Sequence, residues 1–503
     1  MNIQEAKQQI KHAMIAYFSK DEYGNYEIPP EQQRPVFLLG APGIGKTAIM
    51  SQIAQELGVG LVSYSMTHHT RQSALGLPTI RTRSYDGVKY QVSEYTMSEI
   101  LASVYDRIER TGVREGILFL DEINCVSETL MPSMLQFLQF KTFGRHKVPD
   151  GWLVVTAGNP LEYNRSAREF DVVTLDRMKK IEVEPDYEAW RGYAAEKRLH
   201  PAVLTYLDLK RGNFYRVETT PSGKCFVTAR GWEDLARMLR LYEKHELPVD
   251  EKLIGQYLQD RAIAKDFAVY YDLFNRYRSD YQIEAILSGQ LPEEIVLRAA
   301  RAKFDERVAL LGMLAEAVCL RAREQMEQEK ILEAYLQKLQ EWKQGAAAGS
   351  SLDAWTGFVR TQTAAAQSTL KHSDQSSDRL RAKQGLCALL LQEQQAAEAE
   401  QETADDVFPL LRQRAGEQIR QVRSKAEQLK QQLEAVFEFC EAAFSARSVQ
   451  ELLILVTELT MDPHTSAFIS RYGCEGYFRH NRELMFSERQ RSIEQKLDAL
   501  TRG

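Results

Sequence analysis

Residues 36–47 read Val36-Phe37-Leu38-Leu39-Gly40-Ala41-Pro42-Gly43-Ile44-Gly45-Lys46-Thr47. The four apolar residues that begin this stretch are typical of a strand buried on both faces of a parallel sheet. The next eight satisfy the pattern G-x-x-x-x-G-K-[ST], and a helical pattern from Thr47 to Leu57, closed by Gly58, follows them. A chance glycine-rich turn is the alternative, but strand, motif and helix in this order predict a loop whose backbone N–H groups converge on phosphate oxygens.

This loop is the predicted nucleotide site, with ATP and Mg²⁺ as its cofactors. Lys46 would neutralise the β- and γ-phosphates, and Thr47 would ligate Mg²⁺ through its hydroxyl group. The candidate binding residues in the loop are Gly40, Ala41, Pro42, Gly43, Ile44, Gly45, Lys46 and Thr47.

A second apolar run, Ile117–Leu120, ends in the acidic pair Asp121 and Glu122. Such a pair at the carboxyl edge of a parallel sheet lies where a phosphate and its metal bind. Asp121 would hold Mg²⁺ through water, and Glu122 would act as general base on the attacking water. Taken alone, the pair could equally cap a helix. Its combination with the phosphate loop favours hydrolysis.

Alternating apolar runs and helical patterns from Pro35 to about Val183 predict an α/β fold with a parallel sheet. Between the second and third runs, the segment 79–95 contains Asp86-Gly87 and predicts a β-hairpin. The five predicted strands are Val36–Leu39, Leu61–Tyr64, Ile117–Leu120, Leu153–Thr156 and Lys180–Val183.

Three domains are predicted: an α/β nucleotide-binding domain at 1–184, a helical lid at 185–290 and an all-α, coiled-coil-like region at 291–503. Gln, Ala, Glu and Arg dominate after Leu291, a composition typical of long helices. Two apolar seams with steps of three and four residues predict helices that pack against one another. The seams are Phe304, Val308, Leu311, Ala315, Val318, Ala322 and Ala415, Ile419, Val422, Ala426, Leu429, Leu433, Val436.

Further motifs complete a resemblance to a known family. The fourth run ends in Thr156-Ala157-Gly158-Asn159-Pro160, and Arg177 follows a helical break in Leu175-Asp176-Arg177-Met178. With the phosphate loop and the acidic pair, these motifs resemble the AAA+ ATPases. The hairpin at 79–95 is similar to the helix-2 insert of the MoxR branch. The resemblance covers about Asn2 to Gly289.

The resemblance implies a sheet order of 5-1-4-3-2 and a homo-oligomeric ring, expected to be a hexamer. It also implies that Asn159 is the sensor-1 residue, which positions water against the γ-phosphate. Arg230, in Thr228-Ala229-Arg230-Gly231-Trp232, would be the sensor-2 residue of the lid. Arg177 would be the finger that reaches a neighbouring subunit's nucleotide, and these residues join Glu122 in the predicted catalytic set.

Each of these assignments has an alternative. Asn159 precedes a proline and could stabilise a turn. Arg230 could be an ordinary solvent-facing helix residue. For the finger, Arg145, Arg165 and Arg168 compete with Arg177, and Met178 stands where the family pattern normally has Phe.

Length and charge limit the functions. A chain of 503 residues exceeds the size of a single hydrophobic core. Its net charge of -6 gives no overall attraction for nucleic acid, and no segment is apolar over the length of a membrane span. We therefore expect a cytoplasmic protein.

By the resemblance, the function is remodelling, maturation or metal loading of a partner protein, of which proteins with a von Willebrand A-type domain are one class. The alternatives are a nucleotide-gated scaffold that acts through its helical tail and a motor that works on nucleic acid.

Overall fold

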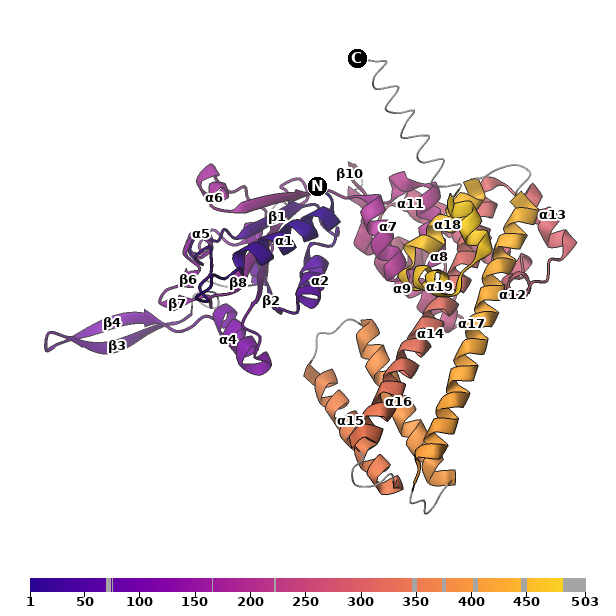
Figure 1. The fold of residues 1–503 in the computed structure, drawn as a ribbon. Coiled ribbons are helices and arrows are strands. Elements are labelled where there is room, and N and C mark those ends of the chain that lie inside the picture. Colours follow the sequence, from indigo (N-terminus) through magenta and orange to yellow (C-terminus); the bar gives the residue numbers. More distant parts are fainter. Residues whose placement is uncertain are drawn as a thin grey trace. The chain divides into compact units, whose positions relative to one another are not determined.

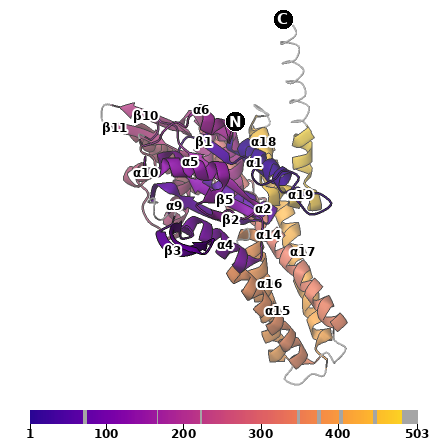
Figure 2. The ribbon, with the colours of Figure 1, turned by 90° about the vertical axis from the view of Figure 1, so that its left-hand side faces the viewer.

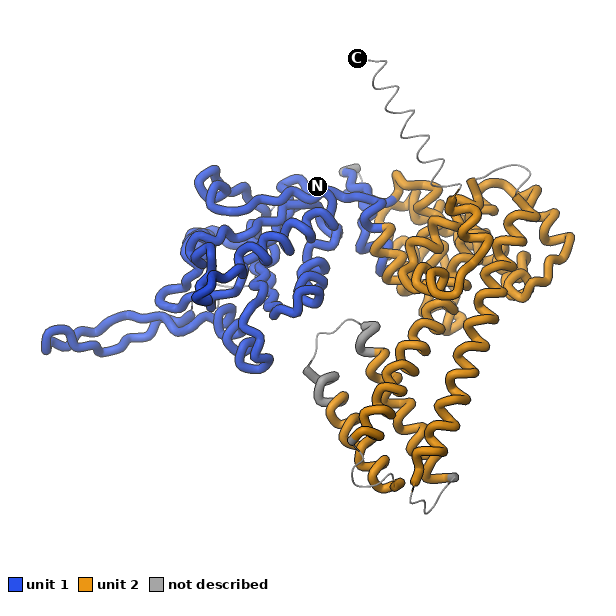
Figure 3. The backbone as a smooth tube through the Cα atoms, viewed as in Figure 1, with its two compact units in different colours: residues 1–190, 214–234 blue, residues 191–213, 235–503 orange. Residues whose placement is uncertain are grey.

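The computed structural model describes residues 1–68, 74, 76–164, 166–220, 223–345, 351–372, 377–400, 406–444 and 450–482. These residues form two compact units (Figure 3). Unit 1 comprises residues 1–190 and 214–234, and unit 2 comprises residues 191–213 and 235–503. The predicted lid, 185–290, is thus divided between the two units, and the boundaries at 184 and 290 remain predictions.

Unit 1 is built around a five-stranded sheet in the order β2-β5-β8-β1-β9, in which all neighbours are parallel (Figure 1). Numbered along the chain as five core strands and read from the other edge, this is the order 5-1-4-3-2 that the resemblance implies. The strands are β1 (Val36–Gly40), β2 (Gly60–Ser65), β5 (Gly116–Asp121), β8 (Trp152–Gly158) and β9 (Lys179–Val183).

Helices cover both faces of this sheet. Successive side chains of each strand point to opposite faces and therefore enter two separate cores. On one face, Val36 and Leu38 pack with α1 (Ile3–Tyr17) and α2 (Lys46–Leu57). On the other face, Phe37 packs in a core with α4 (Glu99–Thr111) and α5 (Met131–Phe140). The continuous apolar runs of the sequence are therefore strands buried from both sides.

The predicted hairpin consists of β3 (Pro78–Tyr85) and β4 (Val88–Tyr95). Both turn residues, Asp86 at φ 49° and Gly87 at φ 83°, have the positive φ values that a two-residue hairpin turn requires. Among its described residues, unit 1 also contains the 3₁₀ turns η1 (Met66–His68) and η2 (Ile123–Cys125), the strand pairs β6 (Thr142–Phe143) with β7 (His146–Lys147) and β10 (Arg216–Thr220) with β11 (Gly223–Val227), and α6 (Val172–Asp176).

Unit 2 is helical, and α7 (Tyr187–Glu196) and α9 (Ala229–Lys244) begin in unit 1 and end in unit 2. Its other elements are α8 (Pro201–Leu209), η3 (Arg211–Asn213), α10 (Glu251–Tyr257), α11 (Arg261–Asp280), α12 (Ile283–Leu287), α13 (Glu293–Arg301), α14 (Phe304–Gly345), α15 (Leu352–His372), α16 (Ser377–Glu400), α17 (Phe408–Phe444), α18 (Gln450–Met461) and α19 (Pro463–Tyr472).

The two predicted seams lie on α14 and α17, which pack against each other within the chain (Figures 1 and 2). Val318 and Leu433 are fully buried in the core that these helices share. Phe304, at the start of its seam, is 38% exposed, and Ile419 and Val422 are partly buried. None of the described helices combines the length and the apolar character that crossing a membrane requires.

Candidate functional site

The phosphate loop joins the end of β1 to the first turn of α2. Gly43 and Gly45 have φ values of 75° and 99°, a region that glycine adopts without strain. Gly40 is required for a different reason, because a Cβ atom there would lie 2.5 Å from the carbonyl oxygen of Val183 in the neighbouring strand. The glycines of the motif therefore allow the turn and its close approach to the sheet.

Lys46 is the first residue of α2 and is only 8% exposed. Its Nζ atom donates hydrogen bonds to the carbonyl oxygens of Gly40 at 2.7 Å and Ala41 at 2.8 Å, and to Oδ1 of Asn159 at 2.9 Å. Burial lowers the pKa of Lys46 to about 8 against the opposing effect of Asp121, and Arg230 adds to the lowering. The ammonium group is thus held in the loop by neutral oxygens that cannot neutralise its charge.

Thr47 and Asp121 lie together, as their predicted shared role requires. The Thr47 hydroxyl donates a hydrogen bond of 2.8 Å to Oδ2 of Asp121. An alcohol and a carboxylate are hard oxygen ligands, and Mg²⁺ in nucleotide sites usually takes one or two of them together with substrate phosphates and water. This pair therefore fits Mg²⁺.

Glu122 has a backbone φ of 56°, unusual for a residue other than glycine, and its N–H donates to Oδ1 of Asp121 at 2.9 Å. Two hydroxyl groups hold its carboxylate: Ser65 Oγ at 3.2 Å and Thr67 Oγ1 at 3.1 Å both donate to Oε2. Ser65 and Thr67 are not among the site residues predicted from the sequence. The available signal was the pairing of β2 with β5, which brings Ser65 directly opposite Asp121.

Asn159 follows the end of β8 and links the loop to the acidic strand. Its side chain accepts the hydrogen bond from Lys46, and its carbonyl oxygen accepts one of 2.8 Å from Nδ2 of Asn124. Asn124 is buried, and a Cβ atom on Gly158 would lie 2.5 Å from its side-chain oxygen. Asn124, a third residue that was not predicted from the sequence, therefore fixes the position of Asn159.

Arg230 lies in the first turn of α9, within unit 1. Its backbone N–H donates to the carbonyl oxygen of Gly43 at 3.2 Å, and its charge acts on Lys46. The hydroxyl of Tyr215 donates to the carbonyl oxygen of Pro42 at 3.0 Å. The segment 214–234 thus contacts the phosphate loop at two adjacent carbonyl groups and brings Arg230 to the site.

Arg177 lies apart from this cluster. It caps the end of α6, is exposed, and donates to Oε1 of Gln139 at 2.6 Å. Of its rivals, Arg168 pairs with Glu128 at 2.6 Å and Arg145 with Glu94 at 2.8 Å, while Arg165 lies outside the described residues. No described hydrogen bond or ion pair joins these arginines to the phosphate loop, so the structure leaves the choice among them open.

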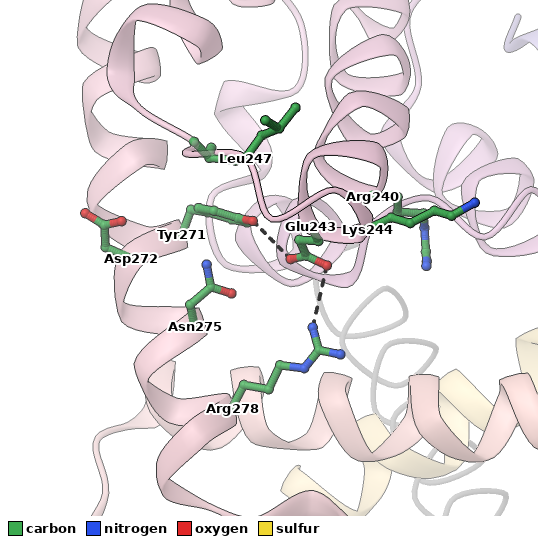
Figure 4. Close-up of a pocket in the computed structure, with 9 residues that line it drawn as sticks. Arg240, Glu243, Lys244, Leu247, Tyr271, Asp272, Asn275 and Arg278 are labelled. Carbon is green, nitrogen blue, oxygen red and sulfur yellow. Dashed lines mark hydrogen bonds and ion pairs between the residues drawn. The ribbon is translucent and has the colours of Figure 1, made fainter.

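A separate polar hollow of about 610 Å³ lies between α9 and α11 in unit 2 (Figure 4). Burial by itself raises the pKa of Glu243, but hydrogen bonds from His200 and Tyr271 and the charges of His200 and Arg278 lower it overall to about 2. Because Glu243 is already paired within the hollow, we assign the hollow no catalytic role. It is lined by Arg240, Glu243, Lys244, Leu247, Val249, Tyr271, Asp272, Asn275 and Arg278.

No group of three or more metal-ligating His, Cys, Asp or Glu side chains occurs among the described residues. The parallel sheet and the phosphate loop of unit 1 fit the core of a P-loop nucleotide-binding domain. Residues 36–162 match the model of the ATPase family associated with various cellular activities (AAA). The matched segment contains the phosphate loop, the acidic pair and Asn159, and it supports an AAA+ ATPase. In the comparison with curated proteins, none matches the chain.

Proposed function

We propose that this chain is a MoxR-type AAA+ enzyme that hydrolyses ATP within a homo-oligomeric ring, a hexamer, and uses the hydrolysis to remodel, mature or load metal into a partner protein. The observation that supports hydrolysis most directly is that five predicted site residues converge at one edge of the sheet: Lys46, Thr47, Asp121, Glu122 and Asn159. Lys46 donates a hydrogen bond of 2.9 Å to Asn159, and Thr47 donates one of 2.8 Å to Asp121.

The proposed chemistry assigns each side chain one task. Lys46 binds the β- and γ-phosphate oxygens, and Thr47 and Asp121 hold Mg²⁺, which would neutralise charge on the phosphates. Glu122, oriented by Ser65 and Thr67, accepts a proton from the attacking water. Asn159 positions that water. Arg230 and, from a neighbouring subunit, Arg177 stabilise charge on the γ-phosphate.

The test of hydrolysis uses two variants of the full chain. Lys46→Ala is expected to abolish ATP binding, because the backbone N–H groups of the loop cannot replace the positive charge that Lys46 places beside the β- and γ-phosphates. Glu122→Gln is expected to bind ATP with unchanged affinity and to hydrolyse it at least about 100-fold more slowly, since general-base catalysis contributes roughly 10²–10⁴-fold. Normal turnover by purified Glu122→Gln would refute the assignment of the base.

The partner is proposed from the resemblance, which implies a client protein, and proteins with a von Willebrand A-type domain are one class of such clients. A Glu122→Gln ring held in the ATP state should retain this partner, and the retained protein should raise the turnover of the wild-type enzyme. A partner that binds without changing turnover would instead favour the nucleotide-gated scaffold, in which slow hydrolysis only resets a switch.

A further inference from the structure

The hairpin β3–β4 extends from the body of unit 1 as a two-stranded ribbon (Figure 1). Its register pairs residues from Pro78 with Tyr95 at the base to Tyr85 with Val88 beside the turn. No third strand pairs with it among the described residues. Its strand edges and both of its faces are therefore open to a further surface. Such contact would stabilise the ribbon, because an isolated two-stranded hairpin is only marginally stable in water.

The two faces of the ribbon differ in character. Residues directly opposite one another share a face, and the faces alternate along each strand. One face, here named the tyrosine face, carries Thr79, Arg81, Arg83, Tyr85, Val88, Tyr90, Val92 and Glu94. The other, here named the polar face because Thr82, Ser84, Lys89, Gln91 and Ser93 form most of it, also carries Pro78, Ile80 and Tyr95.

Large side chains of the tyrosine face are open to solvent. Tyr85, Val88 and Tyr90 are 51%, 53% and 51% exposed. The rings of Tyr85 and Tyr90 pack across the strands with centroids 6.0 Å apart. Contiguous exposed apolar side chains are typical of interaction sites, and tyrosine and arginine contribute strongly to binding at protein interfaces.

The charge of the tyrosine face selects the partner. Arg83 pairs with Glu94 at 2.6 Å, and Arg145 pairs with the same carboxylate at 2.8 Å. Arg81 is exposed and has no ion pair within the described part of the chain. The face therefore presents uncompensated positive charge beside an aromatic pair, which favours acidic and apolar groups on a partner.

The open edge of β3 offers backbone groups as well. Tyr85 and Val88 flank a two-residue turn and so form a hydrogen-bonded pair, which directs the N–H groups of Ser84 and Thr82 outward. An extended segment can pair with such an edge and lay alternate side chains over one face.

We propose that the tyrosine face and the β3 edge bind an extended, acidic and apolar segment of the partner protein. This inference rests on the proposed function, because the partner is the client of the ATPase. Tyrosine and arginine can also stack on single-stranded nucleic acid, but the net charge of -6 opposes that partner over the rest of the chain.

The probe is a fluorescein-labelled peptide of twelve residues in which glutamate alternates with valine, added to the full chain and followed by fluorescence anisotropy. Two variants alter the tyrosine face, Arg81→Glu and Tyr90→Ser. Two matched controls make the same kinds of change on the polar face, Lys89→Glu and Gln91→Ser. A peptide with lysine in place of glutamate and a 20-nucleotide single-stranded DNA are tested in parallel.

We expect saturable binding of the acidic peptide that weakens at least tenfold in both tyrosine-face variants and changes less than twofold in both controls. Equal binding by all four variants, absence of saturable binding to the wild type, equal binding of the lysine peptide, or DNA binding that depends on Arg81 and Tyr90 would overturn the proposal. ATP hydrolysis is measured on the same samples. Its absence would refute the proposed enzyme and leave the docking result to be judged on the peptide alone.

Discussion

At the scale of single residues, the hydroxyl groups of Ser65 and Thr67 allow a test of whether the position of the Glu122 carboxylate matters for hydrolysis. Replacing both (Ser65→Ala with Thr67→Val) removes the two hydroxyl groups that hold its carboxylate. We expect kcat for ATP hydrolysis to fall about 10- to 100-fold with little change in KM, because misplacing a catalytic group slows chemistry rather than binding. Ser63→Ala, at an exposed position of the same strand, is the control. An unchanged kcat in the double variant would remove both hydroxyls from the mechanism.

We expect ATP binding to weaken as the pH rises, because Lys46 loses its charge in the accessible pH range. Its pKa of about 8 in the free protein lies below the usual value for lysine, so a rise from pH 7 to pH 9 converts most of it to the neutral form. Phosphate oxygens favour the charged form, so binding should take up a proton and the affinity for ATP should fall about tenfold over this range.

The measurement is titration calorimetry in buffers of different ionisation enthalpy. Lys141 is the matched control, because burial also lowers its pKa to about 8 and its Nζ donates to the carbonyl oxygen of Pro30. Lys141→Gln should leave the proton uptake unchanged. Uptake that persists in Lys46→Arg, whose charge does not titrate in this range, would assign the proton to another group.

At the scale of elements, the strands and the hairpin could be predicted because their signals are local. Runs such as Ile117–Leu120 are apolar on consecutive residues, and Asp86-Gly87 supplies two positive φ values. The phosphate loop and the acidic pair could be predicted for the same reason, since each is a short motif. Ser65 could be found only by combining the implied neighbourhood of β2 and β5 with their register, which places it opposite Asp121. Thr67 and Asn124 could not be predicted, because their contacts with Glu122 and Asn159 join residues that are distant in sequence or belong to no motif.

The seam on α17 provides a test at this scale. Leu433 is fully buried in the core that α17 shares with α14. Leu433→Ala should destabilise unit 2 by about 2–5 kcal/mol, because it removes buried methyl groups and leaves a cavity. Leu320→Ala, at a position of α14 that is 48% exposed, should change stability much less. Denaturant unfolding measures both variants, and ATP affinity should stay at the wild-type value. A loss of ATP affinity in folded Leu433→Ala would contradict the separation of the helical core from the nucleotide site.

At the scale of the whole molecule, residues 191–213 and 235–290 belong to the same compact unit as the long helices after residue 291, such as α14 and α17. A Cβ atom on Gly312 of α14 would lie 2.3 Å from the Thr205 side chain of α8. Arg240 of α9 forms an ion pair with Glu316 of α14 at 2.7 Å, and Arg191 of α7 forms one with Glu458 of α18. These contacts join segments that the sequence places in separate domains, and no local pattern predicts them.

Truncation after Gly289 should therefore lower the melting temperature and cause aggregation, because α8, α9 and α11 lose the helices that cover them. Scanning calorimetry and size-exclusion chromatography follow the effect. A truncated chain that melts at the temperature of the full chain would show that the predicted boundary at 290 separates independent domains.

The proposed ring is tested by mixing subunits. Arg177→Ala should bind ATP normally and lose turnover by roughly 10³-fold or more, the usual effect of an arginine that acts in trans. Rings assembled from Arg177→Ala and Lys46→Ala subunits should regain part of the activity, because each subunit supplies what the other lacks. Arg145→Ala and Arg168→Ala are measured in parallel, and recovery in one of those mixtures instead would move the finger to that residue.

The division of the chain between two units also bears on how the protein is made. Unit 1 is interrupted between residues 190 and 214, and the chain passes through unit 2 before Tyr215 and Arg230 return to the phosphate loop. During synthesis the sheet can form early, but the loop at residues 40–47 waits for these two contacts. Arg230 lies 47 residues beyond the last strand residue, Val183, so at ribosomal speed the delay after the sheet is complete is on the order of several seconds. A nascent chain stalled before residue 214 would therefore carry a formed strand and motif whose loop is still incompletely supported.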